Sequence, residues 1–184
     1  MKIHTIFTLL SLLFLTLSCR DASIPEDIHE HEEIEMVTLT LTDTENPANI
    51  QTVQYVGGNA DKRLVLRSGA SYRVAVDFMH RHDGDLESML EEIIEEKDEH
   101  FITYEFAGIG VEVERTAEDI VRTDGNRLGV HTLWKVNSAP SSALVSLKLF
   151  HGSSSVDMNF PSASNQQGKA VGGEADVNMQ VRID

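Results

Sequence analysis

The sequence predicts an all-β domain, mainly an antiparallel β-sandwich, that carries one inserted amphipathic acidic helix at about residues 85–97. Three observations lead to this fold class. Most of the chain after residue 34 alternates apolar and polar residues with a period of two, the pattern of half-buried strands. Turn-forming glycine, asparagine and aspartate residues separate these stretches. A helical period occurs in one segment alone, and the repeated β-α-β alternation of a parallel α/β sheet is absent from the sequence.

The strands follow from the alternation. The first is expected where Val37, Leu39 and Leu41 alternate with threonines. A longer strand is expected over 71–82, where apolar residues at even positions share one face. The other predicted strands cover 50–56, 63–67, 101–106, 110–114, 129–136, 143–151 and 174–183. In the last of these, the apolar residues at odd positions from 175 to 183 are expected to face the same way.

The helical segment shows apolar residues three and four positions apart. They are Leu86, Met89, Leu90, Ile93 and Ile94. Asp83 and Asp85 precede this stripe and are expected to cap the helix, because an aspartate there suits the positive end of the helix dipole. The glutamates on the opposite face are most simply a solvated surface.

The amino-terminal segment has the features of a secretory signal. Lys2 precedes a 12-residue apolar stretch, 6–17, which is shorter than the roughly 20 residues that a membrane-spanning helix needs. The chain's single cysteine, Cys19, follows, and the letters LTLSC resemble the lipobox of bacterial lipoproteins, in which this cysteine is lipidated. An ordinary signal peptide with an incidental cysteine is the alternative. We therefore expect a lipoprotein signal peptide at 1–18, a lipidated Cys19 with an acidic tether at 19–34, and a single β-rich domain at 35–184.

Composition narrows the classes of function. The 30 acidic residues exceed the 15 Lys and Arg, and this net charge of −15 argues against nucleic acid as a partner, because phosphate contacts need clustered bases. A single cysteine supplies neither an internal disulfide nor a thiolate zinc cluster. The sequence contains neither a G-x-S-x-G nucleophile elbow nor a phosphate-binding glycine loop. We therefore expect that the protein is not an enzyme.

Histidines and one glutamate form a candidate metal site. His80 and His82 are two residues apart and therefore point to the same side of a strand end. If the predicted helix continues to its end, Glu96 and His100 lie on one face at i and i+4. His151 would close the site if its strand runs beside the one that begins at His100. Imidazoles and carboxylates without a thiolate suit Zn²⁺ or another divalent cation such as Cu²⁺ or Ni²⁺. The alternative is that these histidines are structural residues with ordinary hydrogen bonds.

Several segments resemble a family of Bacteroidota outer-membrane lipoproteins. They are HEEIEMVTLTLT, GASYRVAVDF, LESMLEEIIEEKDEHFITYEF, DGNRLG, LVSLKLFH and GGEADVNMQVRI. The resemblance implies an outer-membrane lipoprotein that accompanies a TonB-dependent receptor at the uptake of a nutrient. Relatives of this kind often carry the label of the type 1 periplasmic-binding fold, which implies two α/β lobes with repeated β-α-β units. The single predicted helix of this chain disagrees with that label.

These observations predict a non-enzymatic, lipid-anchored envelope protein. Its expected role is that of a binding or accessory module for nutrient or cation uptake at the outer membrane, on either the periplasmic or the cell-surface face. The membrane, through the lipid anchor, and a TonB-dependent receptor are its expected partners. The alternative is a structural or interaction lipoprotein that has a protein partner and binds no small ligand.

Overall fold

The computed structural model describes residues 33–184, which form one compact unit. The predicted signal peptide, Cys19 and the tether up to residue 32 lie outside the described residues. Among the residues that the structure describes, none of the helices is long and apolar enough to cross a membrane.

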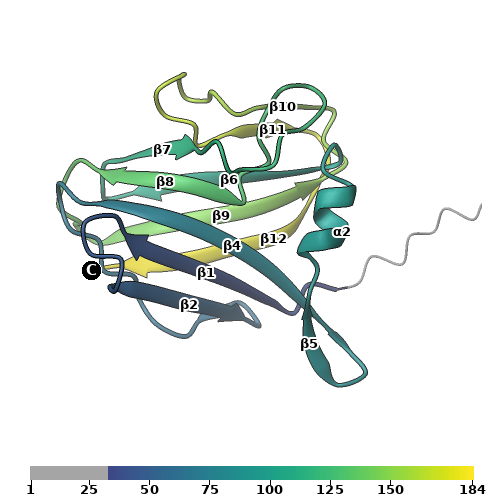
Figure 1. The fold of residues 1–184 in the computed structure, drawn as a ribbon, viewed down its shortest axis with the longest axis horizontal. Helices are drawn as coiled ribbons and strands as arrows, with labels where there is room; N and C mark the ends of the chain where they lie inside the picture. The colour runs from purple at the N-terminus through teal and green to yellow at the C-terminus, as the bar shows by residue number, and fades with distance from the viewer. Residues whose placement is uncertain (1–32) are drawn as a thin grey trace, which may run out of the picture. The chain divides into compact units, whose positions relative to one another are not determined.

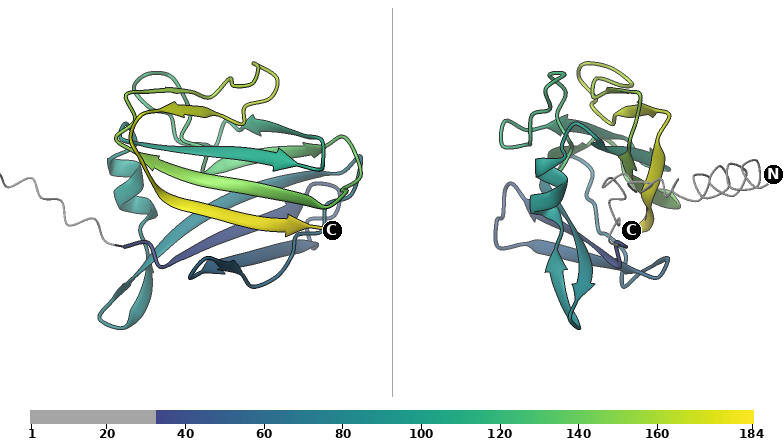
Figure 2. Two further views of the ribbon diagram at one scale, coloured as in Figure 1. Left: turned by 180° about the vertical axis from the view of Figure 1, so that it is seen from behind. Right: turned by 90° about the vertical axis from the view of Figure 1, so that its right-hand side faces the viewer.

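Two antiparallel sheets build the domain, so the predicted all-β sandwich is confirmed (Figure 1). Seven strands form the larger sheet: β1 (Met36–Asp43), β2 (Ile50–Val56), β3 (Asn59–Ala60), β4 (Ser71–His82), β5 (Asp85–Ser88), β7 (Val111–Arg115) and β8 (His131–Val136). Their order is β3-β2-β1-β4-β8-β7, and β5 pairs with β4 off this path. The smaller sheet has the order β12-β9-β6, with strands β12 (Glu174–Ile183), β9 (Ala143–His151) and β6 (His100–Ala107). The left view of Figure 2 shows the smaller sheet in front.

The core lies between the two sheets. Alternate residues of the long strands are buried, and the faces of β1, β4, β9 and β12 that carry them join in a single apolar cluster. At its centre, the fully buried Trp134 of the larger sheet contacts Tyr104 and Phe106 of the smaller sheet edge-on, with ring centroids 5.6 and 4.9 Å apart. The period of two therefore reports correctly which face of each strand is buried.

The predicted helix at 85–97 is wrong in its first half. The helix α2 covers only Leu90–Glu95, and Asp85–Ser88 forms β5, which pairs with β4 in a hairpin. Asp83 and Gly84 occupy the turn with φ of 51° and 96°, the conformation of a tight hairpin turn. Neither predicted aspartate caps the helix, and Leu86 of the expected apolar stripe is exposed. The Asp-Gly turn and the backbone hydrogen bonds of the hairpin outweigh the helical period of these residues.

Other predicted strands need smaller corrections. The segment 63–67 is not a regular strand: Leu64 makes one parallel bridge to Ile183 at the edge of β12, and its amide donates to the Arg182 carbonyl at 2.9 Å. A bulge between Ala175 and Val177 turns Ala175 outward, so it does not share the buried face of its neighbours. Two short strands, β10 (Ser155–Asp157) and β11 (Lys169–Val171), pair within the long loop before β12.

Candidate metal-binding site

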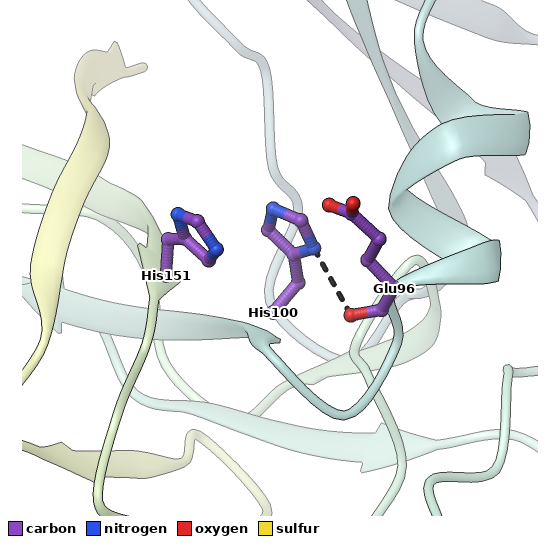
Figure 3. Close-up of side chains that lie close together, drawn as sticks. All are labelled: Glu96, His100 and His151. Atoms are coloured by element: carbon purple, nitrogen blue, oxygen red, sulfur yellow. Dashed lines mark hydrogen bonds between the residues drawn. The ribbon is translucent and has the colours of Figure 1, made fainter. Parts of the chain in front are cut away.

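Two histidines from distant parts of the sequence meet at one end of the smaller sheet. His100 is the first residue of β6 and His151 is the last residue of β9. The two strands are antiparallel, and their register places these residues directly opposite each other. Their rings stack with centroids 4.8 Å apart and planes inclined by 13° (Figure 3). The condition on which the sequence-based hypothesis depended, that the strand of His151 runs beside that of His100, is therefore met.

Glu96 lies close to the two rings and belongs to the segment that directly follows α2. The helix ends at Glu95, one residue before this glutamate, but the chain continues in turns in which the His100 amide still donates to the Glu96 carbonyl at 3.3 Å. The i, i+4 relation thus survives the end of the regular helix. One possible ligand atom from each of Glu96, His100 and His151 lies within 4.8 Å of the other two. Figure 3 shows the three side chains side by side.

The site is sheltered but not closed. His100 is only 6% exposed, whereas Glu96 and His151 are half-buried. Burial lowers the pKa of His100 below its ordinary value, and the neighbouring His151 acts in the same direction. The hydrogen bond to the Glu96 carbonyl and the charges of Asp176 and Glu96 oppose this shift in pKa. At neutral pH His100 is therefore a neutral imidazole, the form that binds a metal ion.

Each imidazole has a hydrogen-bond acceptor at one of its nitrogens. Nδ1 of His100 lies 3.2 Å from the Glu96 backbone oxygen, and Nε2 of His151 lies 3.0 Å from a carboxylate oxygen of Glu99. Glu99 is not among the candidate residues that the sequence indicated. Its only local signal is its position next to His100, because its contact with His151 depends on a pairing between residues 52 positions apart.

His80 and His82 lie elsewhere, on the β4–β5 hairpin. Their rings stack at 6.3 Å, which agrees with the prediction that both point to one side of the strand. Nδ1 of His82 lies 3.9 Å from a carboxylate oxygen of Glu87. Among residues 33–184, groups of three or more possible ligands occur only at Glu96, His100 and His151. The structure therefore separates the hairpin histidines from the other three members of the hypothetical five-residue site.

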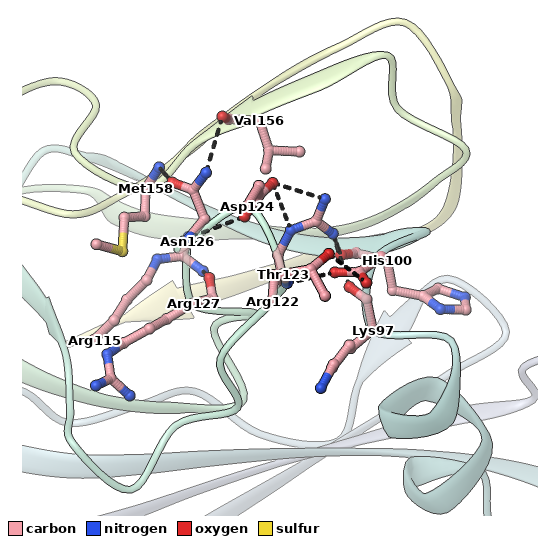
Figure 4. A network of polar contacts seen from close by, with 11 residues as sticks. Lys97, His100, Arg115, Arg122, Thr123, Asp124, Asn126, Arg127, Val156 and Met158 are labelled. Atoms are coloured by element: carbon pink, nitrogen blue, oxygen red, sulfur yellow. Dashed lines mark hydrogen bonds and ion pairs between the residues drawn. The ribbon is translucent and has the colours of Figure 1, made fainter.

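A neighbouring loop holds the segment that carries Glu96 and His100 in place. The guanidinium of Arg122 donates to the carbonyl of Lys97, at 2.7 Å, and to that of His100 (Figure 4). Next to it, the amide and hydroxyl of Thr123 donate to the two carboxylate oxygens of Asp98, at 2.8 and 2.7 Å. These bonds fix the backbone of the turn between α2 and β6, so the positions of Glu96 and His100 depend on the loop at 116–130.

Two imidazole nitrogens and one carboxylate oxygen form a typical donor set for Zn²⁺. Bonds of about 2.0–2.2 Å from zinc to nitrogen and oxygen put the ligand atoms of a tetrahedral site roughly 3.4 Å apart. The separation of up to 4.8 Å therefore has to shrink by at most about 1.4 Å.

Comparisons with protein-family models, with characterised proteins and with solved structures find no match for this chain.

Proposed function

We propose that this protein is a non-enzymatic, lipid-anchored envelope protein that binds a divalent transition cation, Zn²⁺ in the first place, in the course of cation uptake at the outer membrane. The observation that carries the proposal is the convergence of Glu96, His100 and His151 at the meeting point of β6, β9 and α2. These residues come from two segments about 50 positions apart, and the fold brings their electron-pair donors together in a sheltered site.

The electrostatics of the chain favour a cation as the ligand. The net charge of −15 raises the local concentration of cations around the molecule. At the site itself, one ligand is a carboxylate and the buried His100 is neutral at physiological pH. A divalent ion would therefore meet one negative charge and two lone pairs, with no proton to displace from His100.

The number of ligands favours transport or capture over a structural role for the ion. Structural zinc sites are closed by four protein ligands, whereas a site with three leaves one coordination position for water or an incoming group. The apolar core between the two sheets is also complete without an ion. A three-ligand site at the end of such a core is suited to take up an ion and release it again.

The envelope location in this proposal rests on the amino-terminal LTLSC motif and on the resemblance to Bacteroidota lipoproteins. Several acyl chains on Cys19, at about 0.8 kcal/mol per buried methylene, would hold the domain at a membrane surface. A TonB-dependent receptor is the partner that the resemblance implies.

A zinc titration of the chain from Glu33 to Asp184 tests the binding proposal. This chain is the compact unit and lacks the two tether histidines, His29 and His31, which could bind zinc by themselves. We expect one zinc ion per molecule with a Kd below about 10 µM, equivalent to about 7 kcal/mol of binding free energy.

Two pairs of variants make the titration specific. His100→Ala and His151→Ala are each expected to abolish saturable binding, whereas the control changes His80→Ala and His82→Ala should leave the Kd unchanged. Equal affinity in all four variants, or no saturable binding in the unaltered chain, would favour an interaction protein whose histidines are structural.

A further inference from the structure

The outer face of the smaller sheet carries a small cleft that the candidate metal site does not use. Odd residues of β6 and even residues of β9 point away from the core, because their neighbours along each strand form the apolar cluster between the sheets. The left view of Figure 2 shows this face in front, with β11 next to β6. The cleft has a volume of about 160 Å³, and it is lined by Thr103, Glu105, Ser146, Lys148, Phe150 and the segment 168–170.

The wall of the cleft, at 168–170, is held against β6 by the fold itself. The amide of Tyr104 donates to the carbonyl of Gln167 at 2.8 Å, which ties the segment before β11 to β6. Gly168 has a φ of 88°, and a Cβ at this position would collide with the Arg115 guanidinium. The close approach of this wall therefore depends on a glycine. Because the wall is already in place, binding of a ligand does not require it to become ordered.

Two opposite charges in the cleft have no partner within the fold, unlike the charges on the outer face of the larger sheet. On the larger sheet, Lys135 makes ion pairs with Glu112 and Glu114 at 3.3 and 2.9 Å. In the cleft, Lys148 and Glu105 are diagonal neighbours on adjacent strands, a spacing that long side chains can bridge. Nevertheless, neither side chain makes an ion pair or a hydrogen bond with any of residues 33–184. The cleft therefore presents a cation and an anion side by side.

Ser146 lies directly opposite Glu105 and two residues before Lys148. It is only 7% exposed, yet its hydroxyl makes no hydrogen bond with the part of the chain that the structure describes. Burying a hydroxyl without a hydrogen-bond partner costs free energy, so such a group in a cleft points to a partner from outside the chain. Because Ser146 lines the cleft, a molecule that enters the cleft can supply this partner.

We infer that this cleft binds a small zwitterion, namely a free α-amino acid with an apolar side chain. The ammonium group of Lys148 and the hydroxyl of Ser146 bind its carboxylate, and the carboxylate of Glu105 binds its ammonium group. Its apolar side chain packs against the half-buried ring of Phe150. Lys169, in the wall, adds a second positive charge for the carboxylate. This inference goes beyond the proposed binding of a cation and does not depend on it.

The size and the charges of the cleft distinguish this ligand from others. Clefts for drug-sized ligands usually enclose about 300–1,000 Å³, so a cleft of about 160 Å³ suits a smaller molecule. A neutral sugar would leave both Lys148 and Glu105 without a counter-charge, and a simple anion would be repelled by Glu105. A zwitterion satisfies both charges at once.

The test is a titration of the chain from Glu33 to Asp184 with L-leucine, followed by the NMR shifts of the backbone amides. Excess chelator is present throughout, because free amino acids bind zinc. We expect one leucine per molecule with a Kd below about 1 mM. Two analogues each lack one charge: isocaproate has no ammonium group, and isoamylamine has no carboxylate. Each should bind at least about 10-fold more weakly, because each loses a charge-assisted hydrogen bond.

Variants assign each charge of the ligand to one side chain. Lys148→Ala should weaken the binding of L-leucine by at least about 10-fold and leave that of isoamylamine unchanged. Glu105→Gln should weaken the binding of L-leucine by a similar factor and should not weaken that of isocaproate. Lys135→Ala and Glu112→Gln are the matched controls, because they change the same residue types on the outer face of the larger sheet. Neither control should change the Kd of any of the three ligands.

Three results would overturn the inference. They are the absence of saturable L-leucine binding below about 10 mM, equal affinities for L-leucine and isocaproate, and binding of glucose in place of L-leucine. Equal affinities would identify a plain anion site, and glucose binding would identify a carbohydrate cleft. None of these results bears on the zinc titration, so a failure of this inference and a failure of the proposed function are distinguishable.

Discussion

Two polar regions flank the start of β6, and they differ in how their groups are satisfied. In the first, Arg115 is 4% exposed and donates to the carbonyls of Ile102, Arg127 and Gln166 at 2.6, 2.7 and 3.2 Å. Its guanidinium also lies 4.4 Å from the centre of the Phe101 ring. In the second region, Glu96, His100 and His151 bring acceptors together.

The difference between the two regions is whether their polar groups find all their partners within the chain. Burying a polar group costs free energy unless the group is hydrogen-bonded. In the first region, the donors of Arg115 are paired with acceptors from within the fold. Arg122 follows the same rule, with two carbonyls and the Asp124 carboxylate as acceptors (Figure 4). In the histidine cluster, possible ligand atoms of Glu96, His100 and His151 instead lie within 4.8 Å of one another, and we propose that a cation binds between them. Three predictions test this comparison through stability and metal binding, and a fourth tests it through pH.

The largest expected effect is the loss of Arg115. Arg115→Ala leaves three carbonyl oxygens without their donor in a buried region, and each buried unsatisfied group costs about 1–3 kcal/mol. We expect a loss of at least about 3 kcal/mol in the free energy of unfolding, measured with urea, while the folded fraction still binds zinc. Gly129 and Gly168 flank the guanidinium, and a Cβ at either position would collide with it, so the cavity is shaped to this side chain. A loss below about 1 kcal/mol would show that water replaces the arginine.

The addition of zinc should stabilise the domain by the next largest amount. At a free zinc concentration of 100 times the Kd, binding to the folded state alone raises the free energy of unfolding by about 2.7 kcal/mol. Thermal unfolding of the chain from Glu33 to Asp184, with zinc and then with excess chelator, measures this difference. In the His100→Ala variant the two curves should coincide. A zinc-induced shift that persists in this variant would place the ion elsewhere.

Arg122 lies beside both regions: its guanidinium is 5.9 Å from the centre of the Phe101 ring that Arg115 also contacts, and it donates to the turn that carries Glu96 and His100. Arg122→Gln removes the donors to the carbonyls of Lys97 and His100, and we expect a loss of about 2 kcal/mol in stability. Because the turn that carries the ligands loosens, zinc affinity should also fall, by about 10-fold. Arg127→Gln is the control in the same loop, since Arg127 donates to Asp119 and Ala117 rather than to this turn. Unchanged zinc affinity in Arg122→Gln would show that the two regions are independent.

The smallest effect is the pH dependence of the metal-free domain. The pKa of His100 is lowered in the folded state, so below about pH 6.5 the unfolded chain binds a proton more readily than the folded chain does. The contribution of His100 to stability is therefore complete above pH 6.5 and is lost as the pH falls from there toward the lower folded-state pKa. Urea unfolding between pH 7.5 and 5 should show a shallower decline in the His100→Gln variant than in the unaltered chain. Identical slopes would contradict the burial of a neutral imidazole.

Much of the fold could be read from local patterns. The period of two predicted the long strands, and it did so because alternate side chains face one apolar core. The same patterns misread 85–88 as helix, because apolar spacing alone does not distinguish a helix start from a hairpin arm. The Asp83-Gly84 turn decides between them by its backbone conformation.

For the candidate site, the sequence by itself determined the residue types, the nearness of Glu96 to His100 and the position of each histidine at a strand end. Only the tertiary structure decided that His151 lies opposite His100, that Glu99 contacts His151, and that His80 and His82 lie apart on a hairpin. The reason is physical. Local spacing is a property of the backbone geometry of one segment, whereas the register between β6 and β9 depends on how two whole sheets pack their faces together.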